Sequence, residues 1–377
     1  RWRRQLGMGS EVSAGYYRNV ERAREEWTVH LPPFFPNVPV DYNRYSIRDN
    51  ADFQHIFAAS PRLRVVWGGE MRRDYVESAR LFSVTREESQ NLLRFYGNAE
   101  WRPLDRLTIN GGAMIEKYAD KKAELAPRLF ANWQVHENHT LRAGWSRAFR
   151  APSLFEETSD VRFFSGGILL QHRFTPPGAL RPERIDATEL GYLGRIPQWN
   201  GTVDMRLYRE RILDFILDHD VASPLVPAPL LPPTFKFGNE SVTGWSRGFE
   251  AHVRVRPWSD TDLSLGYAHM RIEGLSKDLD LSVPRNSAAL TWIQRYSHGF
   301  SSTLTMYRVG AFKWGSGANP ASAYTSYDMR ASFKTTLSGR PAEFALVLLN
   351  YGPPHDEATF GGVAARAILD RQAFLTL

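Results

Sequence analysis

Apolar and polar side chains alternate along most of this chain. Between residues 249 and 257, for example, every second residue is apolar, and most of the residues between them are charged. The same alternation recurs in 93–101, 107–116, 201–208, 262–270 and 327–337. A period of two places successive side chains on opposite faces of a β-strand, so each of these strands has one apolar face. No comparable stretch shows the helical period with capping residues, and the pattern therefore predicts an all-β protein.

The connections between the strands fall into two classes that alternate along the chain. Short turns are predicted at 60–61, 103–105, 137–139, 197–200, 258–261, 297–299 and 337–341. Longer links are predicted at 19–46, 76–91, 119–122, 151–182, 219–240, 274–284, 314–322 and 353–362, of which only 119–122 is short. We expect about 16 antiparallel strands, many of about 10 residues or more, the first near residues 12–17. Such a sheet has tight turns at one end and large loops at the other.

Two architectures fit such a sheet, a soluble sandwich and a transmembrane β-barrel. Alternation alone does not separate them, because a soluble sheet also has one apolar face. The strands here are longer than the typical soluble strand of about 5–6 residues, and no repeat of the propeller type is visible. Tryptophans gather at strand ends, as in the aromatic girdles of membrane barrels. They are Trp67, Trp101, Trp133, Trp145, Trp258 and Trp314. These features favour a transmembrane antiparallel β-barrel.

Composition and charge narrow the classes of function. The 377 residues are 42% hydrophobic, with 47 basic and 41 acidic side chains. The basic residues are scattered among acidic ones and form no patch of the kind that binds nucleic acid, so we expect no nucleic-acid partner. The absence of cysteine excludes a disulfide scaffold and cysteine-ligated metals. The longest strongly apolar run, 344–349, is far shorter than the roughly 20 residues of a membrane helix.

Several segments resemble the barrel of TonB-dependent outer-membrane receptors. Residues 146–154 read Ser-Arg-Ala-Phe-Arg-Ala-Pro-Ser-Leu, and residues 180–192 contain Leu-Arg-Pro-Glu followed by Glu-Leu-Gly-Tyr. Residues 66–70, 248–250 and 283–285 also have counterparts in that family, and the resemblance extends from about residue 11 to the end of the chain. It implies an all-β, multi-pass barrel in the outer membrane.

The resemblance also shows where this chain departs from the family pattern. Family members have a barrel of 22 strands, filled by an N-terminal plug that engages TonB. No plug precedes the barrel here, and the C-terminal segment 373–377 does not end on an aromatic residue. We therefore expect residues 1–377 to be one domain, a partial barrel from which the plug and the first strands, about six of the 22, are missing.

The function implied by the resemblance is import of a scarce ligand, most often a ferric siderophore, without covalent chemistry and without a cofactor. Heme, cobalamin and glycans remain open as ligands. The expected partners are the ligand, outer-membrane lipid and lipopolysaccharide, and TonB through the missing plug, with the receptor as a monomer. Two alternatives are a passive 16-stranded porin and an outer-membrane hydrolase.

The hydrolase alternative depends on one motif. Gly244-Trp245-Ser246-Arg247-Gly248 fits G-x-S-x-G, but that motif requires a strand followed by a helix, and here it opens an alternating strand. Metal binding depends on two segments, 136–139 and 218–220, which contain histidine with acidic residues. The first lies in a predicted turn, where polar residues are expected anyway. We therefore predict that the chain is not an enzyme and has no metal site.

The large links contain the candidate ligand-binding residues, because they place cations beside aromatic rings. This combination suits an anionic ferric chelate with flat aryl groups. The candidates are Tyr42, Arg44, Tyr45, Arg162, Phe163, Phe164, His172, Arg173, Lys236 and Phe237. On the polar face of the strands, charged side chains are so frequent that they would line a wet wall or contact a plug. They include Arg94, Glu100, Glu116, Asp204, Arg206, Glu250, Arg254, Arg256, Asp328, Arg330 and Lys334.

Overall fold

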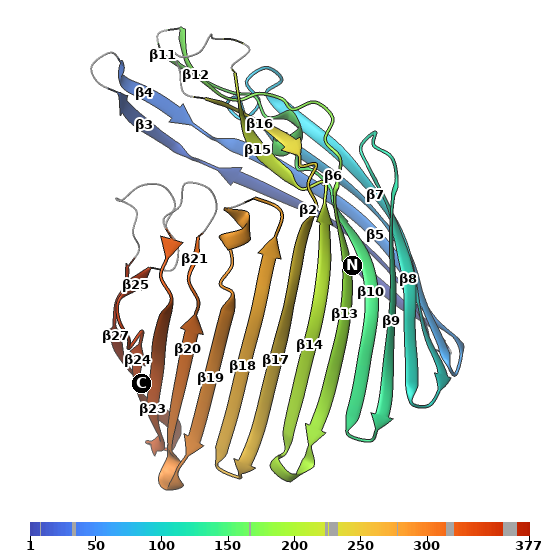
Figure 1. The fold of residues 1–377 in the computed structure, drawn as a ribbon, viewed down its shortest axis with the longest axis vertical. Coiled ribbons are helices and arrows are strands. Elements are labelled where there is room, and N and C mark those ends of the chain that lie inside the picture. Colours follow the sequence, from blue (N-terminus) through green and yellow to red (C-terminus); the bar gives the residue numbers. More distant parts are fainter. Residues whose placement is uncertain are drawn as a thin grey trace. The chain divides into compact units, whose positions relative to one another are not determined.

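The computed structural model describes residues 1–7, 9–31, 35–165, 167–222, 225, 233–276, 278–313, 320–356 and 368–377. Seventeen strands belong to one large sheet (Figure 1), and every strand pair of this sheet whose register is resolved is antiparallel. This confirms the all-β, antiparallel prediction. The described part of the chain contains no helix that is long and apolar enough to cross a membrane.

The large sheet follows the chain order of its strands. They are β1 (Trp2–Gly7), β2 (Ser10–Ala23), β5 (Arg44–Ser60), β6 (Leu63–Glu77), β7 (Glu87–Leu104), β8 (Leu107–Tyr118), β9 (Glu124–His136), β10 (His139–Arg150), β13 (Glu183–Ile196), β14 (Gly201–Leu213), β17 (Gly244–Trp258), β18 (Thr261–Glu273), β19 (Asn286–Arg295), β20 (Phe300–Val309), β23 (Tyr324–Leu337), β24 (Arg340–Leu349) and β27 (Gln372–Thr376). The additional strand relative to the prediction is β1, which pairs with β2 and which the sequence pattern missed because its residues do not alternate.

Shorter elements lie in the links. They are β3 (Glu26–Leu31), β4 (Phe35–Asp41), α1 (Leu154–Thr158), β11 (Val161–Ser165), β12 (Ile168–Phe174), β15 (Ile216–Val221), β16 (Thr234–Asn239), β21 (Phe312–Lys313), β22 (Pro320–Ala321), β25 (His355–Asp356), β26 (Ile368–Leu369) and the 3₁₀ turns Pro197–Trp199, Leu279–Leu281 and Ser297–Gly299. The large links are therefore partly ordered rather than irregular. Trp314 and most of the predicted links 314–322 and 353–362 lie outside the described residues.

The chain divides into two compact units. Unit 1 comprises Arg1–Leu129, Ser146–Asp186 and Ile212–Val242, and unit 2 comprises Phe130–Trp145, Ala187–Arg211 and Thr243–Leu377. Each is described by itself.

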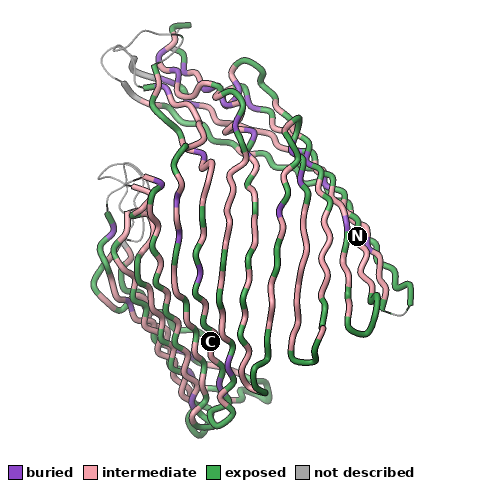
Figure 2. Tube along the Cα trace, turned by 45° about the vertical axis from the view of Figure 1, so that its right-hand side comes forward, coloured by how far each residue is buried: buried purple, intermediate pink, exposed green. Residues whose placement is uncertain are grey.

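In unit 2, strands β17 to β27 of the large sheet pair in sequence and present one apolar and one polar face. Residues directly opposite each other in an antiparallel ladder share a face. Val253 lies opposite Leu265, and Leu265 lies opposite Leu290. Leu265 is 47% exposed, so this apolar face is not buried against any described part of the chain. Figure 2 shows that exposed and half-buried residues predominate along these strands. An exposed apolar face is what a lipid-facing wall requires.

In unit 1, strands β1, β2 and β5 to β8 repeat this division of faces. On one face, the Trp67 ring lies 5.5 Å from the ring of Phe53 and 6.2 Å from the ring of Phe95. On the other face, the Arg94 guanidinium is paired with the carboxylates of Glu70 and Glu116. Charges on the polar face are thus neutralised by neighbours on adjacent strands, as a wall with little apolar cover requires.

The short turns lie where the alternation ends. All seven predicted turns are present, although the one after β7 falls at 105–106, slightly later than predicted. The turn between β23 and β24 shows why these residues suit it. Ser338 and Gly339 have φ of 51° and 76°, and a two-residue hairpin turn of this type requires positive φ at both positions.

The predicted link 151–182 contains one short helix, α1, which the alternation of side chains did not indicate. It begins with a capping box, in which the Ser153 hydroxyl accepts a hydrogen bond from the Glu156 amide at 3.2 Å. The Glu156 carboxylate in turn accepts one from the Ser153 amide at 2.7 Å. A single turn of helix is too short to produce a visible 3.6-residue period, which is why alternation analysis overlooked it.

Candidate ligand-binding site

Four long links of unit 1 are bonded to one another and form what we call the loop assembly, residues 24–43, 78–86, 151–182 and 214–240 where described. The Asp160 amide donates to the Leu81 carbonyl at 3.0 Å, and the Ser83 amide donates to the Asp160 carbonyl at 2.8 Å. The Thr175 amide donates to the Phe235 carbonyl at 3.0 Å. These main-chain bonds connect segments far apart in sequence, so the links are positioned relative to one another.

A small sheet and an aromatic cluster fill the interior of the loop assembly. Strands β11, β12, β16 and β15 pair side by side, and β12 and β16 run parallel. The rings of Phe174 and Phe237 are stacked at 5.4 Å, and both make edge contacts with Phe155. Phe163 is buried against Val40 and Val161. Two of the predicted ligand-binding aromatics, Phe163 and Phe237, therefore hold the loops together.

Tyr42 belongs to the same interior. Its ring makes edge contacts with Trp27 at 5.4 Å and with Phe163 at 6.0 Å. Burial raises the pKa of the Tyr42 hydroxyl above its ordinary value. Tyr42 is half-buried, and its ring packs within the loop assembly more than it is exposed to a ligand.

Arg162 and His172 share one carboxylate inside the loop assembly. Arg162 donates from Nε and Nη2 to the two oxygens of Asp160, each at 2.7 Å, and His172 Nε2 lies 3.2 Å from Asp160 Oδ1. His172 is only 2% exposed, and burial lowers its pKa against the opposing effect of Asp160. Both predicted ligand-binding residues are therefore engaged in an internal network and do not present free charges.

Arg44 and Tyr45 are neighbours in sequence but occupy opposite faces of β5. Arg44 Nη1 donates to Glu25 at 2.6 Å, and its Nη2 lies 3.6 Å from Glu21. The Arg22 guanidinium lies over the Tyr45 ring, 5.3 Å from the ring centroid. The structure thus separates this predicted pair, because successive strand residues point to opposite sides.

Of the remaining three predicted residues, Phe164 is exposed, whereas Arg173 and Lys236 are half-buried. The Arg173 guanidinium stacks over the Phe235 ring at 4.1 Å. Phe164 is 38% exposed. Lys236 lies opposite His219 in the β15–β16 pair and has no ion-pair partner among the described residues.

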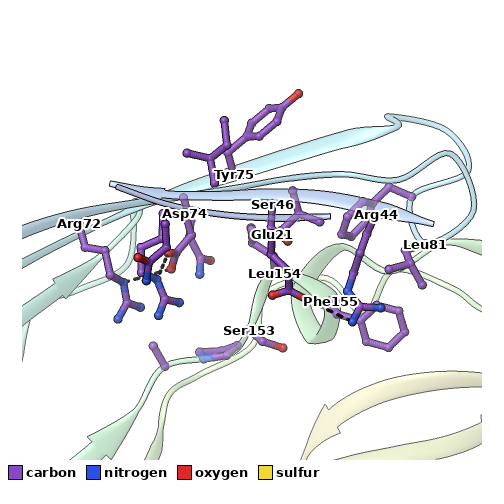
Figure 3. A pocket seen from close by; sticks show the side chains of 18 of the residues that line it. Glu21, Arg44, Ser46, Arg72, Asp74, Tyr75, Leu81, Ser153, Leu154 and Phe155 are labelled. Carbon is purple, nitrogen blue, oxygen red and sulfur yellow. Dashed lines mark hydrogen bonds and ion pairs between the residues drawn. The ribbon is translucent and has the colours of Figure 1, made fainter. Parts of the chain in front are cut away.

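A cavity of about 660 Å³ lies beneath the loop assembly, entirely within unit 1. Figure 3 shows Arg72 and Asp74 side by side on β6 and Arg44 pointing toward Glu21, while Tyr75 points to the other side of the strand. Of the ten predicted residues, only Arg44 lines this cavity. Its lining comprises Asn19, Val20, Glu21, Arg44, Ser46, Ile47, Arg48, Arg72, Asp74, Tyr75, Val76, Leu81, Phe82, Gln90, Tyr118 and 151–155.

Two arginines missed by sequence reasoning dominate the charge of this cavity. Arg48 Nε donates to Asp74 Oδ1 at 2.6 Å, and Arg72 Nε lies 3.1 Å from Asp74 Oδ2. Asp74 is 9% exposed, so one buried carboxylate serves two guanidinium groups. Arg48, Arg72 and Asp74 together therefore carry a net positive charge. In the sequence these residues are ordinary polar positions of alternating strands, and only the cavity distinguishes them.

The helix α1 forms one wall of the cavity and is fixed by Arg150. Arg150 donates to both oxygens of Glu156 at 2.9 Å and to both oxygens of Glu183 at 2.5 and 2.8 Å. Burial raises the pKa of Glu156, but the hydrogen bonds from Arg150 and Ser153 outweigh this, and the net pKa is lowered. The Tyr118 hydroxyl also donates to the Pro152 carbonyl. The wall is therefore held by charged bonds rather than by apolar packing alone.

The candidate metal and nucleophile segments have other roles. His139 Nδ1 lies 2.7 Å from the Tyr192 hydroxyl, and His219 Nε2 lies 2.8 Å from Glu240. Among the described residues no three His, Cys, Asp or Glu side chains gather as metal ligands would. Ser246 stands near the start of β17, which continues to Trp258 with no helix after it, so the motif is not a nucleophile elbow.

Comparison with known proteins gives one family and a consistent set of structures. Residues 1–346 match the family described as "TonB dependent receptor-like, beta-barrel". A search of curated proteins finds no significant match.

Solved structures match the fold at low sequence identity. A mutant of the ferric enterobactin receptor from Pseudomonas aeruginosa, in complex with enterobactin, is 13% identical and has a TM-score of 0.76, over 99% of this chain and 60% of that one. The siderophore receptor PirA from Acinetobacter baumannii is 13% identical, with a TM-score of 0.67 over 92% of this chain and 56% of that one. P. aeruginosa FpvA bound to heterologous pyoverdines is 12% identical, with a TM-score of 0.67 over 99% of this chain and 54% of that one. The chain thus spans little more than half the length of these receptors.

Proposed function

Because the chain belongs to the TonB-dependent receptor family, whose members are outer-membrane β-barrels, we propose that it captures a ferric siderophore as part of an importing receptor. The outer-membrane location of the family confirms the predicted location. Members of the family are transporters and not enzymes, and this confirms the non-enzymatic interpretation. The solved structures of similar fold include receptors named for siderophores, and this supports the choice of ligand class.

The observation that carries the proposal is the arginine-lined cavity beneath the loop assembly. Its volume of about 660 Å³ suits a chelate of small-molecule size. Arg48 and Arg72 share the single carboxylate of Asp74, which leaves guanidinium donors for an anionic ligand. Guanidinium groups donate paired hydrogen bonds to carboxylate-like oxygens and stack on flat aryl groups. Ferric catecholate siderophores combine both features.

The roles follow from the positions of these residues. The loop assembly restricts the entrance, and Arg48 and Arg72 orient the anionic face of the chelate. Iron arrives already coordinated by the siderophore and is substrate, so no protein ligand to iron is required. Release toward the periplasm, in this proposal, depends on TonB acting through a plug domain. The receptor works as a monomer in a lipopolysaccharide-containing membrane. The family assignment speaks against the porin and hydrolase alternatives.

The proposal is tested by binding of iron-labelled siderophores to the receptor expressed from its complete gene. The probes are ferric enterobactin and a ferric hydroxamate, with heme and cobalamin as competitors. Arg48→Gln combined with Arg72→Gln should weaken binding of the bound siderophore by at least tenfold, since each lost charged hydrogen bond costs about 1.5–3 kcal/mol.

Arg206→Gln serves as the matched control. Arg206 Nε donates to Glu189 at 2.9 Å on the polar face of unit 2 and does not line the cavity. Its substitution should leave siderophore affinity within about twofold, because it removes a comparable paired charge elsewhere. Saturable binding of heme or cobalamin by a folded receptor that binds neither siderophore would refute the proposed ligand class.

A further inference from the structure

A row of arginines lies on the outward apolar face of unit 2 and shares no residue with the cavity described above. Arg209 and Arg211 stand on β14, Arg247 on β17 and Arg271 on β18, and all four are exposed. Figure 1 shows these strands as neighbours in the sheet. Arg247 lies directly opposite Arg271 in the β17–β18 ladder. The cations therefore form one surface and not a scatter of isolated charges.

These arginines share their face with the apolar side chains and not with the polar wall. Arg209 is two residues from Leu207, and Arg247 is two residues from Phe249, so each pair points to the same side of its strand. Leu207 is 54% exposed, as expected for the lipid-facing side. Arg206 and Glu250, by contrast, pair with each other at 3.7 Å on the opposite face. The row thus looks outward from the wall.

The cations and the apolar residues are ordered along the strands. β14 runs from a short turn toward a long link, so Arg209 and Arg211 lie nearer the link than Leu207. β17 runs in the opposite direction, and Arg247 again lies nearer the link than Phe249. In this family the long links are external. The arginines therefore stand above the apolar band at the level of the outer-leaflet headgroups.

The charge of this surface is poorly neutralised. Glu273 pairs with Arg247 at 2.9 Å and also with Arg271. Arg209 and Arg211 lie over the Trp245 ring at 4.1 and 6.0 Å, and neither has a carboxylate partner among the described residues. Cation–π contact with tryptophan holds the guanidinium groups in place without cancelling their charge. Four arginines and one glutamate leave a surplus of positive charge facing the membrane surface.

A groove joins the charged row to the apolar band. It has a volume of about 770 Å³, and its lining includes Leu190, Leu207 and Phe249 together with Arg209, Arg247 and Arg271. Glu189 also lines it, but its carboxylate accepts a hydrogen bond from Arg206 at 2.9 Å. An occupant that fits this surface has phosphate groups at one end and acyl chains at the other. We infer that the groove is a binding site for a phosphorylated glycolipid of the outer leaflet, whose phosphates contact the arginines and whose acyl chains lie along the apolar residues.

This site is separate from siderophore capture, because it faces the membrane and uses none of the cavity residues. Its test is lipid binding by the purified receptor, expressed from its complete gene, measured by native mass spectrometry. The probes are bis-phosphorylated lipid A, enzymatically dephosphorylated lipid A and phosphatidylglycerol. Each cation near an anionic lipid surface adds roughly fivefold to binding, so Arg209→Ala with Arg211→Ala should weaken lipid A binding roughly thirty-fold.

The control variant is Arg106→Ala with Arg195→Ala. These two exposed arginines also lack ion pairs among the described residues, and each lies beside a short turn and not beside a long link. This variant should bind lipid A as the wild type does, and Arg209→Lys with Arg211→Lys should retain most of the affinity. Heat-modifiable electrophoretic mobility checks that each variant is folded.

Three results would overturn the inference. The first is unchanged lipid A binding in the folded Arg209/Arg211 alanine variant, and the second is an equal loss in the control. The third concerns the wild type alone. It is that dephosphorylated lipid A or phosphatidylglycerol binds as tightly as bis-phosphorylated lipid A. A clear wild-type preference for the phosphorylated glycolipid, with the loss confined to the Arg209/Arg211 variant, supports it.

Discussion

The Asp160 carboxylate is the point at which the loop assembly is most vulnerable. It accepts two hydrogen bonds from Arg162 and lies beside His172, while its main chain bonds to Leu81 and Ser83. Asp160→Asn keeps the shape of the side chain but removes its charge. The Arg162 guanidinium, with a quarter of its side chain exposed, then lacks a counter-charge.

The size of the effect follows from these contacts. Breaking a buried ion pair by removing one partner costs about 3–5 kcal/mol, and the partial exposure of Arg162 reduces this to about 2–3 kcal/mol. The loss should be local, because the strands of the large sheet are held by their own ladders. Local opening that is easier by about 2–3 kcal/mol accelerates amide exchange by roughly 30- to 150-fold.

Hydrogen–deuterium exchange of peptides covering 78–86 and 160–175 measures this directly. Asp105→Asn is the matched control, because its carboxylate is exposed and pairs with Arg62 at 3.2 Å in a short turn. The control should change exchange by less than about threefold, since an exposed pair contributes at most about 1 kcal/mol. Unchanged exchange at 78–86 in Asp160→Asn, or equal acceleration in the barrel strands, would show that Asp160 does not organise the loops.

Three further predictions concern pH, packing and orientation. The pKa of His172 is lowered below its ordinary 6.5, so the fold favours neutral imidazole. Its contribution is complete above pH 6.5 and is lost as pH falls below that value. The protection of amides in 160–175, measured relative to their intrinsic exchange rate at each pH, should therefore fall between pH 7.5 and 5, and less so in His172→Gln. Gly248→Ala should lower the unfolding temperature by several degrees, because a Cβ there would lie 2.5 Å from the His269 carbonyl oxygen. Gly266→Ala is the control and should not lower it, because the nearest contact of its Cβ would be at 4.0 Å. Equal shifts of the unfolding temperature in the two variants would contradict this prediction. Spin labels at 265 and 264 should differ sharply in accessibility to oxygen dissolved in lipid, and equal relaxation would contradict the outward assignment of Leu265.

The candidate site was much harder to predict than the strands. The sequence indicates cations beside aromatic residues in the links as the ligand-binding residues. Several of these cations, Arg162 and His172 above all, bind other residues of the loop assembly and are not free to bind a ligand. Arg48 and Arg72 were overlooked because a cation on a polar strand face looks the same in sequence whether it faces a cavity or water. To tell a cavity-facing cation from a water-facing one, it is necessary to know which links fold over which strands.

The alternation of side chains was sufficient to determine the all-β architecture, the antiparallel order and the two unequal ends of the sheet. The reason is local: a period of two assigns a face to every residue without reference to distant contacts. Tertiary structure alone decided that Asp160 gathers Arg162 and His172, and that Asp74 bridges Arg48 and Arg72. It also decided that arginines from β14, β17 and β18 form one row. These groupings join residues tens of positions apart, and they depend on strand register and loop docking, which no local pattern encodes.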